Sequence, residues 1–143
     1  MTPQEAAAVV NALGDAFATG DVDAVIERFT DQGQMMYAGS EQGEVAVGLP
    51  ALRRLLADLF SRGERYSWRC TSVHITGSTA GYSIVADATL FVDPWPSRPD
   101  GPTGASFPYR VSGLLEESND GWRWRFCHGS EPTPPAVDSS TGP

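Results

Sequence analysis

Three side chains in this sequence could move a proton inside a small pocket: Tyr37, Asp87 and His128. An imidazole titrates near neutral pH, so His128 could act as a general acid or base. The alternative is a core histidine whose ring is hydrogen-bonded to a backbone carbonyl or to Ser130. We favour that alternative, because no carboxylate lies near His128 in the sequence to orient it.

Asp87 interrupts the apolar stretch from Ile84 to Val92. A carboxylate in mid-strand costs free energy unless it is paired or exposed, which invites a catalytic interpretation. Alternation along the strand argues for a structural one, because Asp87 faces away from Ile84, Ala86, Ala88 and Leu90. We expect it to pair with Arg110, either across the sheet or across a dimer.

Tyr37 carries a hydroxyl that could donate to a ligand carbonyl or to a developing oxyanion. The alternative is a core aromatic residue with its polar tip at the rim. Trp95, in a Pro-rich loop, either covers the pocket mouth or fixes the loop to the body. The residues that we expect to line the pocket are mostly aromatic: Met36, Trp68, Trp95, Tyr109, Trp124 and Phe126.

The elements that must position these groups divide into helices followed by strands. Thr2, Pro3 and Glu5 form a helix-start signal, Asp21 can cap a second helix, and Pro50 opens a third. From Tyr66 the apolar period changes from helical spacing to two. Helices followed by strands predict an α+β fold whose antiparallel sheet buries one face under the helices. The expected long strands are 66–75, 82–92, 107–117 and 122–130.

The last two strands, joined at Ser118–Gly121, form a predicted hairpin with two distinct faces. With regular alternation, its apolar face carries Tyr109, Val111, Leu115, Trp122, Trp124, Phe126 and His128, and should meet the helices. The opposite face suits water or a partner subunit. It carries Arg110, Ser112, Leu114, Glu116, Arg123, Arg125 and Cys127.

Composition excludes several classes of function. The formal net charge is -8 and the sequence pI about 4.5, so we expect no binding to nucleic acid or to an anionic membrane. The histidines and cysteines show no metal-ligand spacing, and no glycine-rich loop precedes a helix, so we expect neither metal nor cofactor. Two isolated cysteines and the lack of a signal peptide or a long apolar run favour the cytoplasm.

Three stretches of the sequence resemble the SnoaL-like branch of the nuclear-transport-factor-2-like superfamily. Residues 19–24 resemble the turn between the family's first two helices, 48–52 the entry into its third, and 121–130 its closing strand. Arg110 matches an arginine often seen on the preceding strand. The likeness runs from Pro3 to Glu131 and implies a cystatin-like roll. In this roll a cone-shaped, curved antiparallel sheet wraps around the N-terminal helices, usually in a homodimer.

The resemblance also implies a pocket, without fixing its reaction. The family includes isomerases, cyclases, dehydratases and epoxide hydrolases that act on small, mostly apolar molecules, and also association domains that catalyse nothing. We therefore hold two hypotheses: a cofactor-independent acid–base enzyme, and a non-catalytic ligand-binding or dimerisation domain. A Tyr–Asp or His–carboxylate pair in the cavity favours the first. A cavity filled by Trp124, Phe126 and Met36 favours the second.

Two expectations concern the organisation of the whole chain. Residues 1–131 should form a single domain, and the Pro/Ser/Thr-rich residues 132–143 a flexible tail. A homodimer should form through the outer face of the sheet, with Leu114, Arg123, Arg125 and Cys127 in or near the interface.

Overall fold

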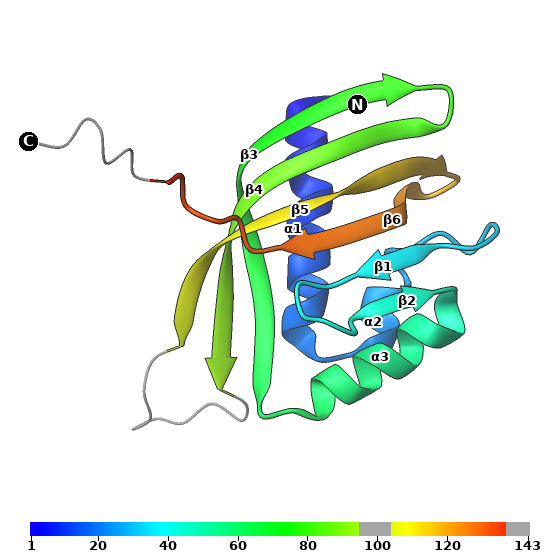
Figure 1. Cartoon of the computed structure of the whole chain (residues 1–143). Coiled ribbons are helices and arrows are strands. Elements are labelled where there is room, and N and C mark those ends of the chain that lie inside the picture. Colours follow the sequence, from blue (N-terminus) through cyan, green and yellow to red (C-terminus); the bar gives the residue numbers. More distant parts are fainter. Residues whose placement is uncertain (95–103, 137–143) are drawn as a thin grey trace, which may run out of the picture.

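The computed structural model describes residues 1–94 and 104–136, which form an α+β fold. Its elements in chain order are α1 (Pro3–Thr19), α2 (Val22–Ile26), β1 (Met36–Ala38), β2 (Val45–Val47), α3 (Leu49–Ser61), β3 (Glu64–Ser78), β4 (Gly81–Pro94), β5 (Ala105–Ser118) and β6 (Gly121–Ser130). The long strands bend around α1, which lies across one face of the sheet (Figure 1). In the described residues, no helix combines the length and the apolarity that a bilayer crossing requires.

Helix α1 begins where the sequence predicts. The Thr2 side chain accepts a hydrogen bond from the Glu5 backbone, and the Glu5 side chain accepts one from the Thr2 backbone, which completes the capping box. Gly20 ends the helix with φ 68°, in the left-handed region that glycine tolerates. The buried stripe of α1 includes Val10, Leu13 and Phe17, so the helix supplies the apolar layer against which the sheet packs.

The sheet has the strand order β2-β1-β6-β5-β4-β3. Strands β3 to β6 form the expected antiparallel meander. The short β1–β2 hairpin joins the other side of β6, and β1 runs parallel to β6 there, which the sequence pattern does not reveal. This parallel pairing places Tyr37 beside Cys127, and so brings an early residue of the chain to the centre of the fold.

A β-bulge in β6 reverses the predicted faces at the end of this strand. Leu115 pairs with Trp124 and Leu114 with Phe126, so Arg125 has no partner across the β5–β6 ladder. Because one extra residue shifts the alternation, Cys127 is buried inside the fold while Phe126 and His128 lie on the outer face. The prediction of an inward Phe126 and His128 and an outward Cys127 is therefore wrong.

Interactions of Arg125 stabilise the bulge. Its guanidinium forms two 2.8 Å bonds with the Glu116 carboxylate and donates to the carbonyl oxygens of Gln32 and Gln34. These two carbonyls belong to the segment that leads into β1, about 90 residues earlier in the chain. The bulge therefore fixes the β1 approach to the β5–β6 hairpin.

A cluster of aromatic rings occupies the core between α1 and the sheet. Phe17 lies 5.0 Å from Trp68, 5.9 Å from Phe60 and 6.0 Å from Tyr37 between ring centroids. Burying each large apolar side chain contributes about 1.5–3 kcal/mol, so this cluster is a main source of stability. Gly14 permits the close approach of α1, because a Cβ there would lie 2.7 Å from the Trp68 carbonyl oxygen.

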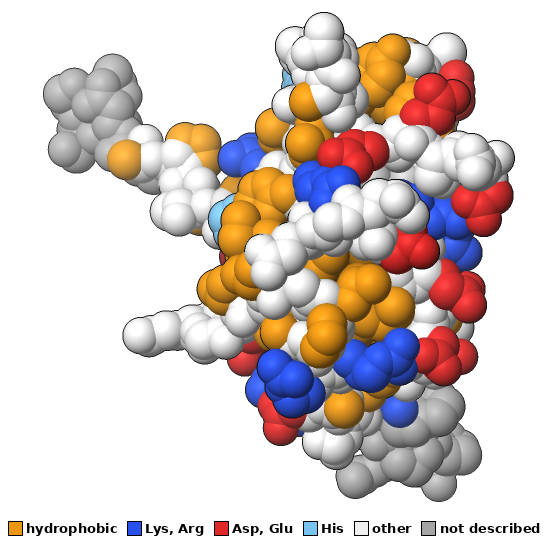
Figure 2. Space-filling view, turned by 90° about the vertical axis from the view of Figure 1, so that its right-hand side faces the viewer, with side chains coloured by type: hydrophobic (Ala, Val, Ile, Leu, Met, Phe, Trp, Pro, Cys, Tyr) orange, Lys and Arg blue, Asp and Glu red, His pale blue; other side chains and the backbone are white. Residues whose placement is uncertain are grey.

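The outer face of the sheet and its β1–β2 edge expose several large hydrophobic side chains. These are Met36, Val45, Val47, Val85 and Phe91. Phe107 is also exposed, but it pairs with inward Leu90 and so belongs to the inner face. Figure 2 shows hydrophobic side chains on the left and centre of the view and acidic ones along its right-hand edge.

Candidate functional site

A small cleft opens where β1 and its turn meet the long strands. Its volume is about 70 Å³, room for about two waters or the reacting end of a small molecule. One wall is apolar, and the other carries hydroxyl and carboxyl groups. The lining residues are Phe17, Tyr37, Ser40, Glu41, Glu44, Leu59, Tyr66, Trp68, Leu90, Tyr109 and Glu131.

Tyr37 is the most deeply placed polar residue of the cleft, at 4% exposed. Burial raises the pKa of its phenol well above the ordinary value, and interactions with Tyr109, Cys127 and Glu44 raise it further. The hydroxyl is therefore neutral at physiological pH and keeps its proton to donate. No hydrogen bond joins it to another described residue, so this donor is free for a ligand.

Tyr109 contributes a second neutral hydroxyl from β5. Burial is the main cause that raises its pKa, followed by the Cys127 thiol, and a hydrogen bond from Ser40 partly offsets them. The hydroxyl lies against Gly129 of β6, where any Cβ would overlap it. Glycine at position 129 therefore fixes where the Tyr109 hydroxyl can sit.

Glu44 supplies the carboxyl group of the cleft, from the turn that precedes β2. Burial raises the pKa of this carboxyl above its ordinary value of 4.5, and a hydrogen bond from the Glu41 backbone partly lowers it. In that bond the Glu41 N–H donates to Glu44 Oε1 over 3.0 Å. A carboxylate whose pKa is raised is a stronger base than an ordinary one, which suits it to accept a proton.

The turn that carries Glu44 is fixed to α3. Arg62, which caps the helix at its C-terminus, bonds Glu41 over 3.2 Å and Asp58 over 3.1 Å. Gly39 leaves room for the Glu44 side chain, since a Cβ at 39 would lie 2.9 Å from Glu44 Cδ. Sequence reasoning missed Glu44 because it lies in a polar turn outside any periodic pattern. The glycines at 39 and 43 are the only local signal that the chain folds back there.

Tyr66 stands at the edge of the cleft and is less buried. Its hydroxyl donates to Glu64 Oε2 over 3.1 Å. Burial, followed by the Glu64 charge, raises its pKa to about 12. Because this donor is already used, Tyr66 has no free proton to offer a ligand, in contrast to Tyr37.

Of the residues singled out from the sequence, Tyr37, Trp68 and Tyr109 line this cleft. Trp68 forms apolar wall only, because its indole N–H donates to the Val10 carbonyl over 2.8 Å. Trp124 is buried but lies outside the cleft lining, and Trp95 lies outside the described residues.

The other selected residues lie on the outer face. Asp87 bonds Arg110 over 3.0 Å, in the cross-strand pair that alternation predicts. His128 stacks on Phe126 at 6.4 Å, and Met36 is opposite Phe126 in the ladder. Met36 and Phe126 were expected to line the pocket, and both expectations are wrong because their side chains point away from it. Neither Asp87 nor His128 can therefore act with Tyr37 in this cleft.

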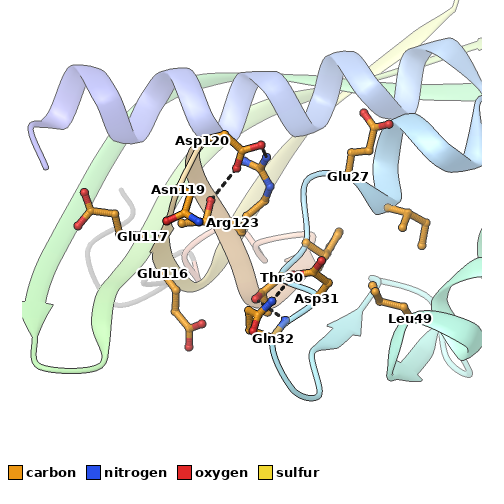
Figure 3. A pocket seen from close by; sticks show the side chains of 13 residues that line it. Glu27, Thr30, Asp31, Gln32, Leu49, Glu116, Glu117, Asn119, Asp120 and Arg123 are labelled. Atoms are coloured by element: carbon orange, nitrogen blue, oxygen red, sulfur yellow. Dashed lines mark hydrogen bonds and ion pairs between the residues drawn. The ribbon is translucent and has the colours of Figure 1, made fainter.

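A much larger groove, of about 900 Å³, lies beside the β5–β6 turn. Figure 3 shows Glu27, Asp31, Glu116, Glu117 and Asp120 around it. Most of these carboxylates are exposed, Asp120 bonds Arg123 over 3.0 Å, and Glu116 bonds Arg125. Among the residues that the structure describes, no three potential ligands gather to hold a metal ion. We take the smaller cleft as the candidate site, because it brings two buried tyrosine hydroxyls together with the partly buried Glu44 carboxyl.

Comparison with known proteins identifies the fold and its relatives. A family model described as SnoaL-like domain matches residues 6–134. No curated protein matches the chain at a significant level.

Solved structures with the same fold are distant in sequence. A protein named as a dehydratase of the NTF2-like family, from Streptomyces avermitilis, has a TM-score of 0.71 at 16% identity, over 92% of this chain and 96% of that one. An NTF2-like superfamily protein from Salmonella enterica has a TM-score of 0.71 at 14% identity, over 95% of this chain and 94% of that one. A ketosteroid isomerase-like protein from Erwinia carotovora atroseptica has a TM-score of 0.63 at 19% identity, over 94% of this chain and 100% of that one. At such identities the likeness establishes the fold alone.

Proposed function

Because the chain belongs to the SnoaL-like domain family, within the NTF2-like superfamily, we propose that it is a cofactor-independent enzyme. In this proposal it moves a proton on a small, largely apolar carbonyl compound. One observation carries the proposal: two neutral tyrosine hydroxyls and a carboxyl of raised pKa line the same cleft. The names of two structural neighbours, a dehydratase and a ketosteroid isomerase-like protein, belong to the same class of chemistry.

Each group has a defined role in the proposed reaction. The hydroxyls of Tyr37 and Tyr109 donate to the substrate carbonyl oxygen and stabilise the negative charge that develops on it. The Glu44 carboxylate removes a proton from the adjacent carbon and returns it to the product. Phe17, Leu59 and Leu90 hold the apolar part of the substrate. Because the cleft is small, only the reacting end enters, and the remainder lies at the mouth.

The proposal is tested by hydrogen exchange on model ketones. Cyclohexanone, cyclopent-2-enone and acetophenone are incubated with the protein in D₂O, and deuterium uptake at the α-carbon is followed by NMR. We expect uptake above the buffer rate for at least one ketone, and a reduction of about 10²-fold or more in Glu44→Gln. Glu27→Gln is the matched control, because Glu27 is an exposed carboxylate outside the cleft.

Two results would contradict the proposed enzyme. One is a ketone that binds in the cleft, as judged by the Tyr109 backbone resonance, yet exchanges no faster than in buffer. The other is a panel in which no ketone binds there at all. Equal exchange by wild type and Glu44→Gln would remove Glu44 from the mechanism.

The small volume of the cleft favours a second candidate function, a non-catalytic ligand-binding or association domain. A cavity filled by Trp124, Phe126 and Met36 was expected to favour this alternative, and none of these residues lines the cleft. Saturable binding of a ketone without exchange, unchanged in Glu44→Gln, is the result that this second function predicts.

A further inference from the structure

A second groove lies between α1 and the start of β6 and shares no lining residue with the tyrosine cleft. Its volume is about 220 Å³, several times the roughly 30 Å³ that one water occupies. The lining residues are Ala8, Val9, Ala12, Arg28, Asp120, Gly121, Trp122, Arg123 and Trp124. Of these, Figure 3 labels Asp120 and Arg123, near the α1 ribbon.

The two long walls of this groove are apolar. On α1 the side chains of Ala8, Val9 and Ala12 are short, which leaves the space open. Opposite them stands Trp122, whose ring is held edge-to-face against Tyr82 at 5.4 Å. A wall of small side chains that faces an indole ring held in place suits a flat apolar group.

Arg28 is the cation of this groove. Its backbone carbonyl oxygen accepts a hydrogen bond from the Trp124 backbone N–H over 2.9 Å, which fixes the Arg28 backbone beside the groove. Its exposed side chain pairs with no carboxylate among the described residues, although the sequence has 18 acidic residues for ten basic ones. Arg123, across the groove, is instead held by Asp120 over 3.0 Å. One unpaired positive charge therefore remains at the groove.

Trp124 carries an unused hydrogen-bond donor. The residue is 1% exposed, and its indole N–H has no acceptor within the described part of the chain. The nitrogen itself is enclosed, so a ligand in the groove does not contact it directly. Because Trp124 lines the groove, its indole resonance can report whether the groove is occupied.

We propose that the α1–β6 groove binds a small aromatic monocarboxylate. The ring lies between the short side chains of α1 and Trp122, and the carboxylate pairs with Arg28. The Asp120 carboxylate on the rim disfavours a multiply charged anion such as a phosphate, which selects a single negative charge.

The test uses benzoate as the probe and benzyl alcohol as its uncharged counterpart. Each is titrated into the ¹⁵N-labelled full chain, and the assigned indole N–H resonance of Trp124 is followed by NMR. We expect a saturable shift with benzoate and binding of benzyl alcohol at least five times weaker. Arg28→Gln should weaken benzoate binding about two- to fivefold, as expected for the loss of one exposed ion pair.

The matched control is Arg54→Gln, because Arg54 is exposed on α3 and pairs with no carboxylate among the described residues. It should bind benzoate as wild type does. The proposal is overturned if benzoate leaves the Trp124 indole resonance unchanged, if it shifts only residues of the tyrosine cleft, or if Arg28→Gln and Arg54→Gln bind it equally.

Discussion

At the scale of single residues, the environment of Glu44 predicts how stability depends on pH. Burial raises the pKa of this carboxyl in the folded protein above its ordinary value. Ionisation of Glu44 is therefore less favourable in the folded than in the unfolded chain. As pH rises from below 4.5 through the raised pKa, this difference lowers the free energy of unfolding. Its contribution is absent at lower pH, where folded and unfolded chains are both protonated at this site.

Replacing Glu44 with Gln removes that charge and keeps an oxygen to accept the bond from the Glu41 N–H. We expect Glu44→Gln to melt at a higher temperature than wild type at pH 7 to 8, with the gain lost as pH falls below the ordinary pKa. Circular dichroism melts at several pH values measure this, with Glu27→Gln as the exposed control. A gain of equal size at acidic and neutral pH would contradict the role of ionisation.

Replacing Tyr37 should affect activity much more than stability. The residue is buried, but its hydroxyl makes no hydrogen bond to another described residue, so Tyr37→Phe should change the free energy of unfolding by less than about 1 kcal/mol. Under the proposed mechanism, the same change should lower ketone exchange by about 10²-fold, because an oxyanion donor is lost. Urea denaturation and the exchange assay measure the two effects.

Tyr66→Phe is the companion variant, because the Tyr66 hydroxyl already donates to Glu64. It should leave exchange within a few-fold of wild type. A large loss of activity in Tyr66→Phe, or none in Tyr37→Phe, would assign the donor role differently.

At the scale of elements, local signals made the helices and long strands predictable. Thr2, Glu5 and Gly20 act within one turn of α1, and the period-two pattern of β3 to β6 depends only on neighbouring residues. The Asp87–Arg110 pair followed from the same alternation. These features require no knowledge of distant contacts.

What the sequence could not predict depends on distant contacts. The β6 bulge is stabilised by bonds from Arg125 to the carbonyls of Gln32 and Gln34. Glu44 enters the cleft through a turn whose Glu41 bonds Arg62 of a later helix end. Neither contact leaves a periodic signal, so the faces of Phe126, Cys127 and His128 were assigned wrongly and Glu44 was missed.

Because of the bulge, replacing two nearby arginines, Arg125 and Arg123, should lower the free energy of unfolding by unequal amounts. Arg125→Ala removes two bonds to Glu116 and two to backbone carbonyls, so we expect a loss of about 1–3 kcal/mol in the free energy of unfolding. Arg123→Ala removes a pair with the largely exposed Asp120 and should cost less than about 1 kcal/mol. Urea denaturation compares them, and equal costs would mean that the Arg125 bonds do not stabilise the bulge.

At the scale of the whole molecule, we propose that two chains associate through the outer face of the sheet. Val85 and Phe91 are exposed there beside half-buried Leu114 and Phe126, and such apolar surface usually marks an interface. Cys127, expected near this interface, is instead buried within the chain. Sedimentation should therefore give a dimer at micromolar concentration.

A charge at the centre of this face should weaken the dimer. We expect Val85→Glu to raise the dissociation constant at least tenfold, because the carboxylate would be buried without a partner. Thr76→Glu, an exposed position nearer the strand end, is the control and should remain dimeric. A wild-type chain that sediments only as a monomer would remove the proposal.

The β6 bulge also matters for anyone who aligns this chain with its relatives. A homologous strand without the bulge has one residue fewer, so a correct alignment needs a gap opposite Arg125. Without that gap, the buried Cys127 is matched to an outward position and the outward His128 to a buried one. At the 14–19% identity of the structural neighbours named above, a sequence alignment that omits this gap scores almost as well as the correct one. Transfer of a histidine role from a relative to His128 should therefore rest on superposed strands.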